Sequence, residues 1–435
     1  MRTLVIGDLE VTRATCAMLT DRGLDVLHLL NPTDVELRQR LDTSFDAVAV
    51  LVRGDVTALR YVLLVEQITP GVRLIATVFD RTLATKLEAV VPNCSVDSPG
   101  DIAVPSIVAA CLGDETVAVD FGESHPRRLV RDDEGALALL PYVKARRPRS
   151  VSRAVVGRLA AHDDATRVLL LGLAGLLSIL LVDWAVLTVA LDTSPLWALY
   201  AATRVVTTVG PGEADHDGAG WYLVLAIVFM LVTVILTALF TAATVERVMS
   251  NRALTLVGRR VPPRADHVVI VGLGQVGLRL ANALLQLSIG VIVVERDPGA
   301  ANLRLAKGAG IPVFIGDGHD VATLRRVGIH RARAVAAMAS ADLDNIEVAI
   351  AASAVAPRIP IALRAGEDDL ISETRSLFRI GEVRNVSGLT AAAVVERLQR
   401  SGDVIAFVED DRIATYDGAT ESVIPGVSRC DCDAV

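Results

Sequence analysis

The sequence predicts an α/β protein in which two doubly wound parallel-sheet domains lie on either side of two membrane-spanning helices. Three observations lead to this prediction. Of the 435 residues 52% are apolar and 22% charged, and the mean hydropathy is +0.47, which is too apolar for a soluble protein and too charged for one that is membrane throughout. Two long hydrophobic segments lie near the middle, and a strand–turn–helix–strand rhythm occurs before and after them.

The predicted domain boundaries follow changes in hydrophobicity and charge along the chain, at about 100–200 residues per domain. We expect an N-terminal α/β domain at 1–113, a small second lobe at 114–143, a basic linker at 144–166, the membrane module at 167–249, a second linker at 250–264, a C-terminal α/β domain at 265–389 and a C-terminal small lobe at 390–435. The net charge is −8, so nucleic acid is not an expected partner.

The membrane module contains two candidate spans, at 168–191 and 221–245. The second has 25 residues without a charge, about 37 Å of helix, which exceeds a hydrocarbon core of about 30 Å. The first is apolar except for Asp183. A carboxylate at membrane depth is expected to be functional or paired, and Arg204 is a candidate partner.

Flanking charge predicts the orientation of the spans. Basic residues stand before the first span and after the second: Lys144, Arg146, Arg147, Arg149, Arg153, Arg158, Arg167, Arg247, Arg252, Arg259, Arg260 and Arg264. The segment between the spans carries acids, and Arg204 is its only Lys or Arg. The positive-inside rule therefore predicts a multi-pass protein of the cell membrane with both termini in the cytoplasm.

The segment 194–213 between the spans begins with Ser194 and Pro195, a typical helix start. After about three apolar turns it ends in Thr-Thr-Val-Gly-Pro-Gly-Glu. This pattern resembles the pore loop of two-transmembrane potassium channels, whose filter reads Thr-Val-Gly-Tyr-Gly followed by Asp. The resemblance implies a re-entrant pore helix and a filter in which carbonyl groups, with the Thr208 hydroxyl, bind K⁺. The implied filter residues are Thr208, Val209, Gly210, Pro211 and Gly212.

Two features of this segment depart from the channel pattern. Pro211 stands where the family has Tyr, and its ring disfavours helical backbone angles at Gly210. Arg204 lies in the predicted pore helix, where it either neutralises Asp183 or opposes a cation path. Both departures favour an alternative function, a non-conducting or weakly selective membrane-bound sensor of nucleotide with a degenerate filter.

The C-terminal domain opens with a buried strand at 267–271, which runs into Gly272, Gly274 and Gly277 and then into a helix. A second strand at 291–294 ends at Glu295, 18 residues after the last glycine. A glycine-rich turn of this kind brings a pyrophosphate close to the backbone N–H groups at a helix start, and the acid accepts hydrogen bonds from ribose hydroxyls. The sequence therefore predicts a dinucleotide site.

The stretch 265–389 resembles the RCK domain (regulator of K⁺ conductance), a Rossmann-like nucleotide-binding domain of potassium channels and uptake systems. The resemblance implies that a nucleotide is bound by Gly272, Gly274, Gln275, Val276, Gly277, Glu295 and Asp317. A carboxylate at position 295 favours NAD(H) or an adenine nucleotide over NADP(H), because a 2′-phosphate would be repelled.

The N-terminal domain has the same rhythm of strands and helices, but its turn reads Gly7-Asp8-Leu9-Glu10-Val11-Thr12 and keeps only the first glycine. Asp8 and Glu10 would oppose a pyrophosphate, and Asn31 follows the second strand where an acid is expected. We interpret this copy as a degenerate, structural or regulatory neighbour of the C-terminal domain.

Together these features predict a nucleotide-regulated cation channel, for potassium, in the lipid bilayer. By the channel resemblance, four copies would enclose one pore and supply eight RCK-like domains for a gating ring. We expect binding and permeation rather than enzymatic turnover. A dehydrogenase is disfavoured because the sequence has no convincing hydride-transfer residues, and a regulatory subunit of a separate transporter is disfavoured by the chain's own pore loop.

Overall fold

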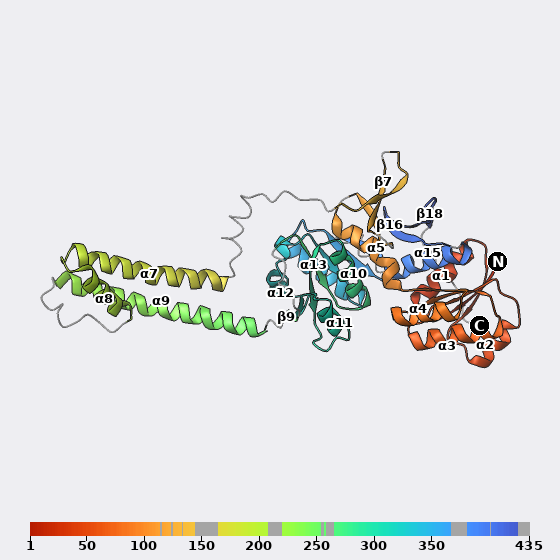
Figure 1. Cartoon of the computed structure of the whole chain (residues 1–435), viewed down its shortest axis with the longest axis horizontal. Coiled ribbons are helices and arrows are strands. Elements are labelled where there is room, and N and C mark those ends of the chain that lie inside the picture. Colours follow the sequence, from red (N-terminus) through yellow and green to blue (C-terminus); the bar gives the residue numbers. More distant parts are fainter. Residues whose placement is uncertain are drawn as a thin grey trace. The chain divides into compact units, whose positions relative to one another are not determined.

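A computed structural model of the chain describes residues 1–113, 115–122, 125–132, 134–143, 164–207, 220–253, 256–257, 265–366, 381–400 and 402–424. The chain divides into two compact units (Figure 1). One unit joins Met1–Lys144, here called the N-terminal half, to Leu256–Val435, the C-terminal half. The other unit is Ala145–Thr255, the helical unit.

The N-terminal half is built on a five-stranded parallel sheet with strand order β2-β1-β3-β4-β5. Its elements are β1 (Arg2–Ile6), α1 (Glu10–Asp21), β2 (Asp25–Leu29), α2 (Asp34–Leu41), β3 (Ala47–Val50), α3 (Asp55–Ile68), β4 (Arg73–Thr77), α4 (Arg81–Val90), β5 (Cys94–Asp97) and α5 (Pro99–Leu112). All four residues of β3 are buried, as expected for a central strand covered by helices on both faces. The predicted Rossmann-like fold of this half is confirmed.

The C-terminal half contains a seven-stranded sheet with strand order β15-β14-β13-β10-β11-β12-β9. Its elements are β9 (Leu256–Val257), β10 (His267–Val271), α10 (Gln275–Gln286), β11 (Gly290–Glu295), α11 (Leu303–Gly308), β12 (Val313–Ile315), α12 (Val321–Arg326), η2 (Ile329–Arg331), β13 (Ala334–Ala337), α13 (Asp342–Val355), β14 (Ile361–Ala365), β15 (Glu382–Asn385) and α15 (Val386–Gln399). Only β9 pairs antiparallel among these described strands. It lies within the segment predicted to be a linker, so this linker contributes an edge strand.

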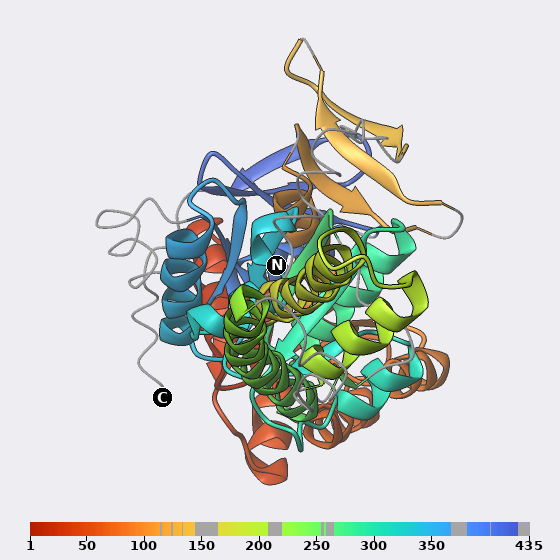
Figure 2. The same cartoon turned by 90° about the vertical axis from the view of Figure 1, so that its left-hand side faces the viewer.

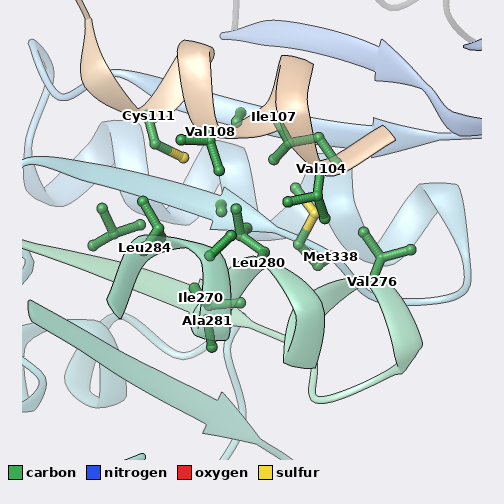
Figure 3. Packing of buried hydrophobic residues seen from close by; sticks show 14 of the residues in the cluster. Val104, Ile107, Val108, Cys111, Ile270, Val276, Leu280, Ala281, Leu284 and Met338 are labelled. Carbon is green, nitrogen blue, oxygen red and sulfur yellow. The ribbon is translucent and has the colours of Figure 1, made fainter. Parts of the chain in front are cut away.

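The two halves exchange their last helices. Helix α5 of the N-terminal half packs on α10, the first helix of the C-terminal half, and α15 packs on α1. Figure 3 shows Val104, Ile107 and Val108 of α5 against Leu280 and Leu284 of α10 in one buried cluster. The halves therefore share a hydrophobic core, in which burial of each such side chain contributes roughly 1.5–3 kcal/mol to the stability of the fold. The predicted domain boundary at residue 389 falls inside α15.

Ion pairs reinforce the contact between α15 and the N-terminal half. Arg22 donates to Glu396 with an Nη2–Oε1 distance of 2.6 Å, and Arg397 pairs with Asp97 at the end of β5. Burial raises the pKa of the Asp97 carboxyl, and the adjacent Arg397 guanidinium opposes that rise. Because a buried charge is costly without a partner, these pairs fix the register of α15 on the N-terminal half.

Each half also carries a small antiparallel sheet. One consists of β6 (Thr116–Asp120), β7 (Arg127–Arg131) and β8 (Leu137–Pro141), and the other of β16 (Ile405–Glu409), β17 (Arg412–Tyr416) and β18 (Glu421–Ile424). The two sheets lie side by side (Figures 1 and 2) and share a cluster that includes Leu129 and Phe407. Arg131 of β7 pairs with Glu409 and Glu421 across this contact. Within the segment 390–435, predicted as a small lobe, the described residues form the last part of α15 and this second sheet.

The helical unit comprises α7 (Asp164–Val189), α8 (Pro195–Val206) and α9 (Gly220–Ala253). Among the described residues, two stretches are long and apolar enough to cross a membrane, Leu171–Val189 with mean hydropathy 2.0 and Gly220–Ala242 with 3.0. Only 22% and 11% of these stretches are buried, so most of their apolar side chains need a partner other than water. Small residues of α7 let α9 approach: a Cβ on Gly175 would lie 2.9 Å from the side chain of Leu236.

Candidate functional site

The glycine-rich turn after β10 is shaped by two positions that tolerate only glycine. Gly272 has a φ of +100°, and a Cβ there would lie 2.9 Å from the backbone nitrogen of Ala339. A Cβ on Gly277 would lie 2.1 Å from the carbonyl oxygen of Gly272. These two glycines therefore serve the tight turn and the close packing of α10 on the sheet.

Gly274 is different, because a Cβ built on it meets no atom within 4 Å. It is the N-cap residue of α10, and no side chain caps the first turn of this helix. Backbone N–H groups at a helix start attract anions. The empty space beside Gly274 is thus a cradle in which a phosphate would contact the start of α10 without steric conflict.

Glu295 ends β11 next to this turn. Its carboxylate accepts hydrogen bonds from the backbone N–H of Leu273 at 2.7 Å and from that of Asp297 at 3.0 Å. These bonds hold the carboxylate beside the cradle, where a ribose bound at the end of β11 would meet its oxygens. The residues present therefore fit a nucleotide with free ribose hydroxyls.

Asp317 lies two residues after the end of β12, the strand that pairs with β11. Its Oδ1 atom accepts from the backbone N–H of His319 at 2.9 Å and lies 3.1 Å from the Nδ1 atom of that histidine. Asp317 and Glu295 line one cleft of about 430 Å³. The other residues that line it are Val271, Gly272, Leu273, Gly274, Val294, Arg296, Asp297, Ala300, Ala301, Asn302, Gly316, Gly318, His319, Met338, Ala339, Ser340, Ala341, Asp344 and Val348.

Several residues that line or support this cleft were not predicted from the sequence. Asn302 is 9% exposed and donates from Nδ2 to the carbonyl of Leu273 at 3.0 Å. This hydrogen bond holds the glycine-rich turn in place. Asn345 fixes the loop after β13 through Ala339, whose N–H donates to its Oδ1 at 2.8 Å. The position of β13 in the strand rhythm could have indicated this loop, but no local motif identifies Asn302.

The predicted nucleotide residues do not all face the same cleft. Gly272, Gly274, Glu295 and Asp317 line the 430 Å³ cleft. Gln275 and Val276 instead line a larger cleft of about 1090 Å³ between the two halves, together with Glu10, Asp342 and Arg364. Gly274 borders both clefts, so the glycine-rich turn separates the predicted nucleotide site from the junction of the halves.

The corresponding turn of the N-terminal half has a different shape. A Cβ on Gly7 would lie 2.0 Å from the carbonyl oxygen of Leu51, so this glycine keeps the role of Gly272. Thr12 stands where Gly277 stands and donates from Oγ1 to Leu51 at 3.0 Å. Leu9 is the N-cap residue of α1, in the place of Gly274.

The strand register also identifies the residue of the N-terminal half that corresponds to Glu295. Ile6 pairs with Leu29 as Val271 pairs with Val294, so the equivalent of Glu295 is Leu30 rather than Asn31. That position carries no acid, as the sequence indicated. The equivalent residue is Leu30, one position before the Asn31 named from the sequence. That this half binds no nucleotide stays a prediction.

The predicted filter residues, Thr208, Val209, Gly210, Pro211 and Gly212, lie outside the described part of the chain. The helix before them begins at Pro195 with Ser194 as its N-cap residue, as predicted, although the Ser194 side chain makes no capping bond. Among the neighbouring residues, Trp184 donates from Nε1 to the carbonyl of Pro195 at 3.0 Å, which ties α7 to the start of α8.

The two intramembrane charges of the prediction are both in the helical unit. Asp183 is fully buried and accepts a hydrogen bond from the hydroxyl of Tyr222 at 3.4 Å, which links α7 to α9. The guanidinium carbon of Arg204 lies 5.8 Å from the ring centroid of Tyr200, one turn earlier on α8. The suggested pairing of Asp183 with Arg204 stays a prediction.

With this geometry in view, comparisons with known proteins identify the class of the C-terminal half. Residues 268–381, about a quarter of the chain, match the TrkA-N domain family, so this segment is a TrkA-N domain. The Trk system potassium uptake protein TrkA of Streptomyces coelicolor is 45% identical over 80 residues, which cover 18% of this chain and 35% of that protein. Potassium channel protein 1 of Methanocaldococcus jannaschii is 19% identical over 245 residues, 55% of this chain and 72% of that protein.

The chain is thus related to RCK-containing proteins of potassium transport. It spans 28% of an uncharacterized protein of Methanothermus fervidus and 35% of the Streptomyces protein, about a third of the length of these curated relatives. Among solved structures, the GsuK channel is 12% identical, with a TM-score of 0.51, over 93% of this chain and 66% of that chain. The same channel bound to NAD gives a TM-score of 0.49 over 92% of this chain and 63% of that chain. The likeness to the GsuK channel concerns the fold.

Proposed function

We propose that the chain is the subunit of a nucleotide-regulated cation channel, selective for K⁺, in which four copies surround one pore. The observation that carries the proposal is a TrkA-N domain with an open phosphate cradle at Gly274, on the same chain as two mostly exposed apolar helices. The proposed activity is binding and permeation, without covalent turnover.

The nucleotide is NAD(H) or an adenine nucleotide. Its pyrophosphate contacts the start of α10 beside Gly274, and its ribose hydroxyls donate to Glu295. Support comes from the cleft of about 430 Å³ that these residues share with Asp317. A 2′-phosphate would bring negative charge against the Glu295 carboxylate, so NADP(H) binds more weakly.

The pore is formed by α7, α8 and α9 with the segment 208–212. Support comes from the sequence Thr-Val-Gly at 208–210, directly after a short apolar helix that two candidate spans flank. The C-terminal end of such a helix carries partial negative charge, which attracts a cation. Both termini are cytoplasmic, since the Lys and Arg residues flank the outer ends of the module in sequence.

Gating passes through the connection after α9. Only residues 254 and 255 separate α9 from β9 in the sequence, and β9 pairs with β12 of the C-terminal sheet. A nucleotide that binds one arrangement of the RCK domains more tightly would shift the equilibrium toward that arrangement. The short connection would pass that shift to the end of α9.

The proposal predicts nucleotide-dependent ion flux from the protein alone. Purified full-length protein in liposomes should pass K⁺ faster than Na⁺, and saturating NAD⁺ or ADP should change the K⁺ rate by roughly 5- to 150-fold, the usual range of an allosteric coupling. The measurement is fluorescence-monitored flux in K⁺ and Na⁺ gradients, with protein-free liposomes as control. Absence of flux with and without nucleotide would refute the channel.

A second candidate function is a non-conducting or weakly selective membrane sensor that binds the same nucleotide. Pro211 in the predicted filter favours it, as does Arg204 in the helix before it. The flux assay separates the two functions, because a sensor would bind nucleotide in the membrane and leave the ion gradient unchanged. Nucleotide consumed during the assay would instead indicate an enzyme.

A further inference from the structure

Arg279 lies one turn after the glycine-rich turn, on α10, with a side chain that is 12% exposed. Its guanidinium donates to acceptors in both halves. Within the C-terminal half, Nη1 donates to the side-chain oxygen of Gln275 at 2.7 Å, and Gln275 follows Gly274 directly. In the N-terminal half, Nη2 donates to the carbonyl of Phe79 at 2.7 Å, and Nε donates to Asp101 at 3.2 Å.

The N-terminal half is shaped to receive this side chain. Gly100, in the first turn of α5, faces the stem of Arg279, and a Cβ there would lie 2.7 Å from the Cδ atom of Arg279. Asp101 also accepts from the exposed Arg81 at 2.7 Å. A guanidinium with this little exposure is costly unless its donors are satisfied, so the three acceptors hold Arg279 in one geometry.

The bonded geometry joins the predicted nucleotide cradle to the other half of the molecule. The cradle is the start of α10, and the same helix packs along α5 through Val276, Leu280 and Leu284 (Figure 3). The planar fork of an arginine fixes direction as well as distance. A displacement of the first turn of α10 is therefore carried to α5 and to the loop after β4.

We propose that Arg279 couples nucleotide binding in the C-terminal half to the N-terminal half. The inference rests on the proposed nucleotide binding and deepens it, by naming the residue through which the half with the degenerate turn responds to its neighbour's ligand. Arg279 is a positioning residue, because it contacts Gln275 beside the cradle, whereas the nucleotide contacts the cradle itself. Because coupling is reciprocal, the contacts of Phe79 and Asp101 also influence nucleotide affinity.

Hydrogen exchange on the full-length protein tests the coupling. Saturating NAD⁺ or ADP should slow amide exchange at 272–277 and also at 79–81 and 99–105 in the N-terminal half. In Arg279→Gln, nucleotide should still bind, with a Kd that changes by less than about tenfold, and should still protect 272–277. The protection of 79–81 and 99–105 should be lost. Simple structural damage would not remove the distant protection alone.

Two further variants complete the test. Arg81→Gln removes the exposed partner of Asp101 without touching α10 and should keep the distant protection. Asp101→Ala removes the acceptor of the Arg279 Nε–H group on α5 and should lose the protection of 99–105. This second variant carries the test if Arg279→Gln does not fold. Distant protection that persists in both Arg279→Gln and Asp101→Ala overturns the inference and leaves the proposed nucleotide site standing. A wild-type protein that binds neither NAD⁺ nor ADP overturns both.

Discussion

Replacement of Gly274 by valine is expected to abolish nucleotide binding and to leave the fold intact. The Gly274 backbone has a φ of −70° and a ψ of −172°, which is extended backbone that valine adopts readily. Its Cβ would meet no protein atom within 4 Å. The added methyl groups would instead fill the space in which a phosphate approaches the N–H groups of α10. We expect the Kd for NAD⁺ or ADP to rise at least about 100-fold, because the displaced contacts are hydrogen bonds to a charged group.

Calorimetric titration and thermal unfolding measure the two sides of this prediction. The melting temperature should stay within about 4 °C of the wild type. Valine is a poorer N-cap residue than glycine by about 1 kcal/mol, and its smaller conformational freedom in the unfolded chain offsets part of that cost. Gly308→Val is the matched control, because a Cβ at Gly308 also meets no atom within 4 Å and the residue lies at the end of α11. A Gly274→Val protein with wild-type affinity would show that the cradle does not hold the nucleotide.

Gly277 would be a poor choice for the same experiment. A side chain at 277 would collide with the carbonyl of Gly272 at 2.1 Å, and relief of that collision would require movement of the turn or of α10. Overpacking of this kind costs about 1–3 kcal/mol or more. Loss of binding in a Gly277 variant would therefore not distinguish damage to the fold from damage to the site, whereas the Gly274→Val substitution does.

Replacement of Gly210 by alanine is expected to reduce K⁺ flux in liposomes to the background of protein-free vesicles. The channel resemblance places this glycine in a filter whose successive carbonyls point at the ion, and such a backbone uses conformations that glycine adopts and alanine resists. A tetramer carries the substitution four times around one axis, so the filter is disturbed in every subunit. We expect at least a tenfold loss of flux with unchanged nucleotide affinity.

Gly220→Ala is the control for this variant. It adds the same methyl group in the same helical unit, at the start of α9, where a Cβ meets no atom within 4 Å. Its flux should equal that of the wild type. Wild-type flux in Gly210→Ala would contradict a filter at 208–212, and equal losses in both variants would point to a general effect on the helical unit.

The sequence predicted the parts of the fold that depend on local pattern. The strands at 267–271 and 291–294, the turn at Gly272–Gly277 and the position of Glu295 after its strand all follow from short-range periodicity and from the special angles of glycine. The structure brings Glu295 and Asp317 to one cleft, because the carboxyl ends of neighbouring parallel strands meet at one edge of a sheet.

The parts that the sequence did not predict depend on contacts between distant residues. The exchange of α5 and α15 between the halves rests on contacts between residues 178 and 374 positions apart, Arg279 with Asp101 and Arg22 with Glu396. No local motif encodes such contacts. The same exchange turns Gln275 toward the junction of the halves rather than toward the nucleotide cleft. The short pairing of β9 with β12 lacks a sequence signal because two residues are too few for a pattern.

In the proposed channel, the segment around Val209 meets three copies of itself within the bilayer. A density map of the full-length protein in lipid nanodiscs with K⁺ tests it most directly. We predict a fourfold axis lined by residues 208–212, with ion density between their carbonyl groups. A monomer or dimer, or a tetramer with this segment away from the axis, would contradict the channel and leave a membrane-anchored binder of nucleotide.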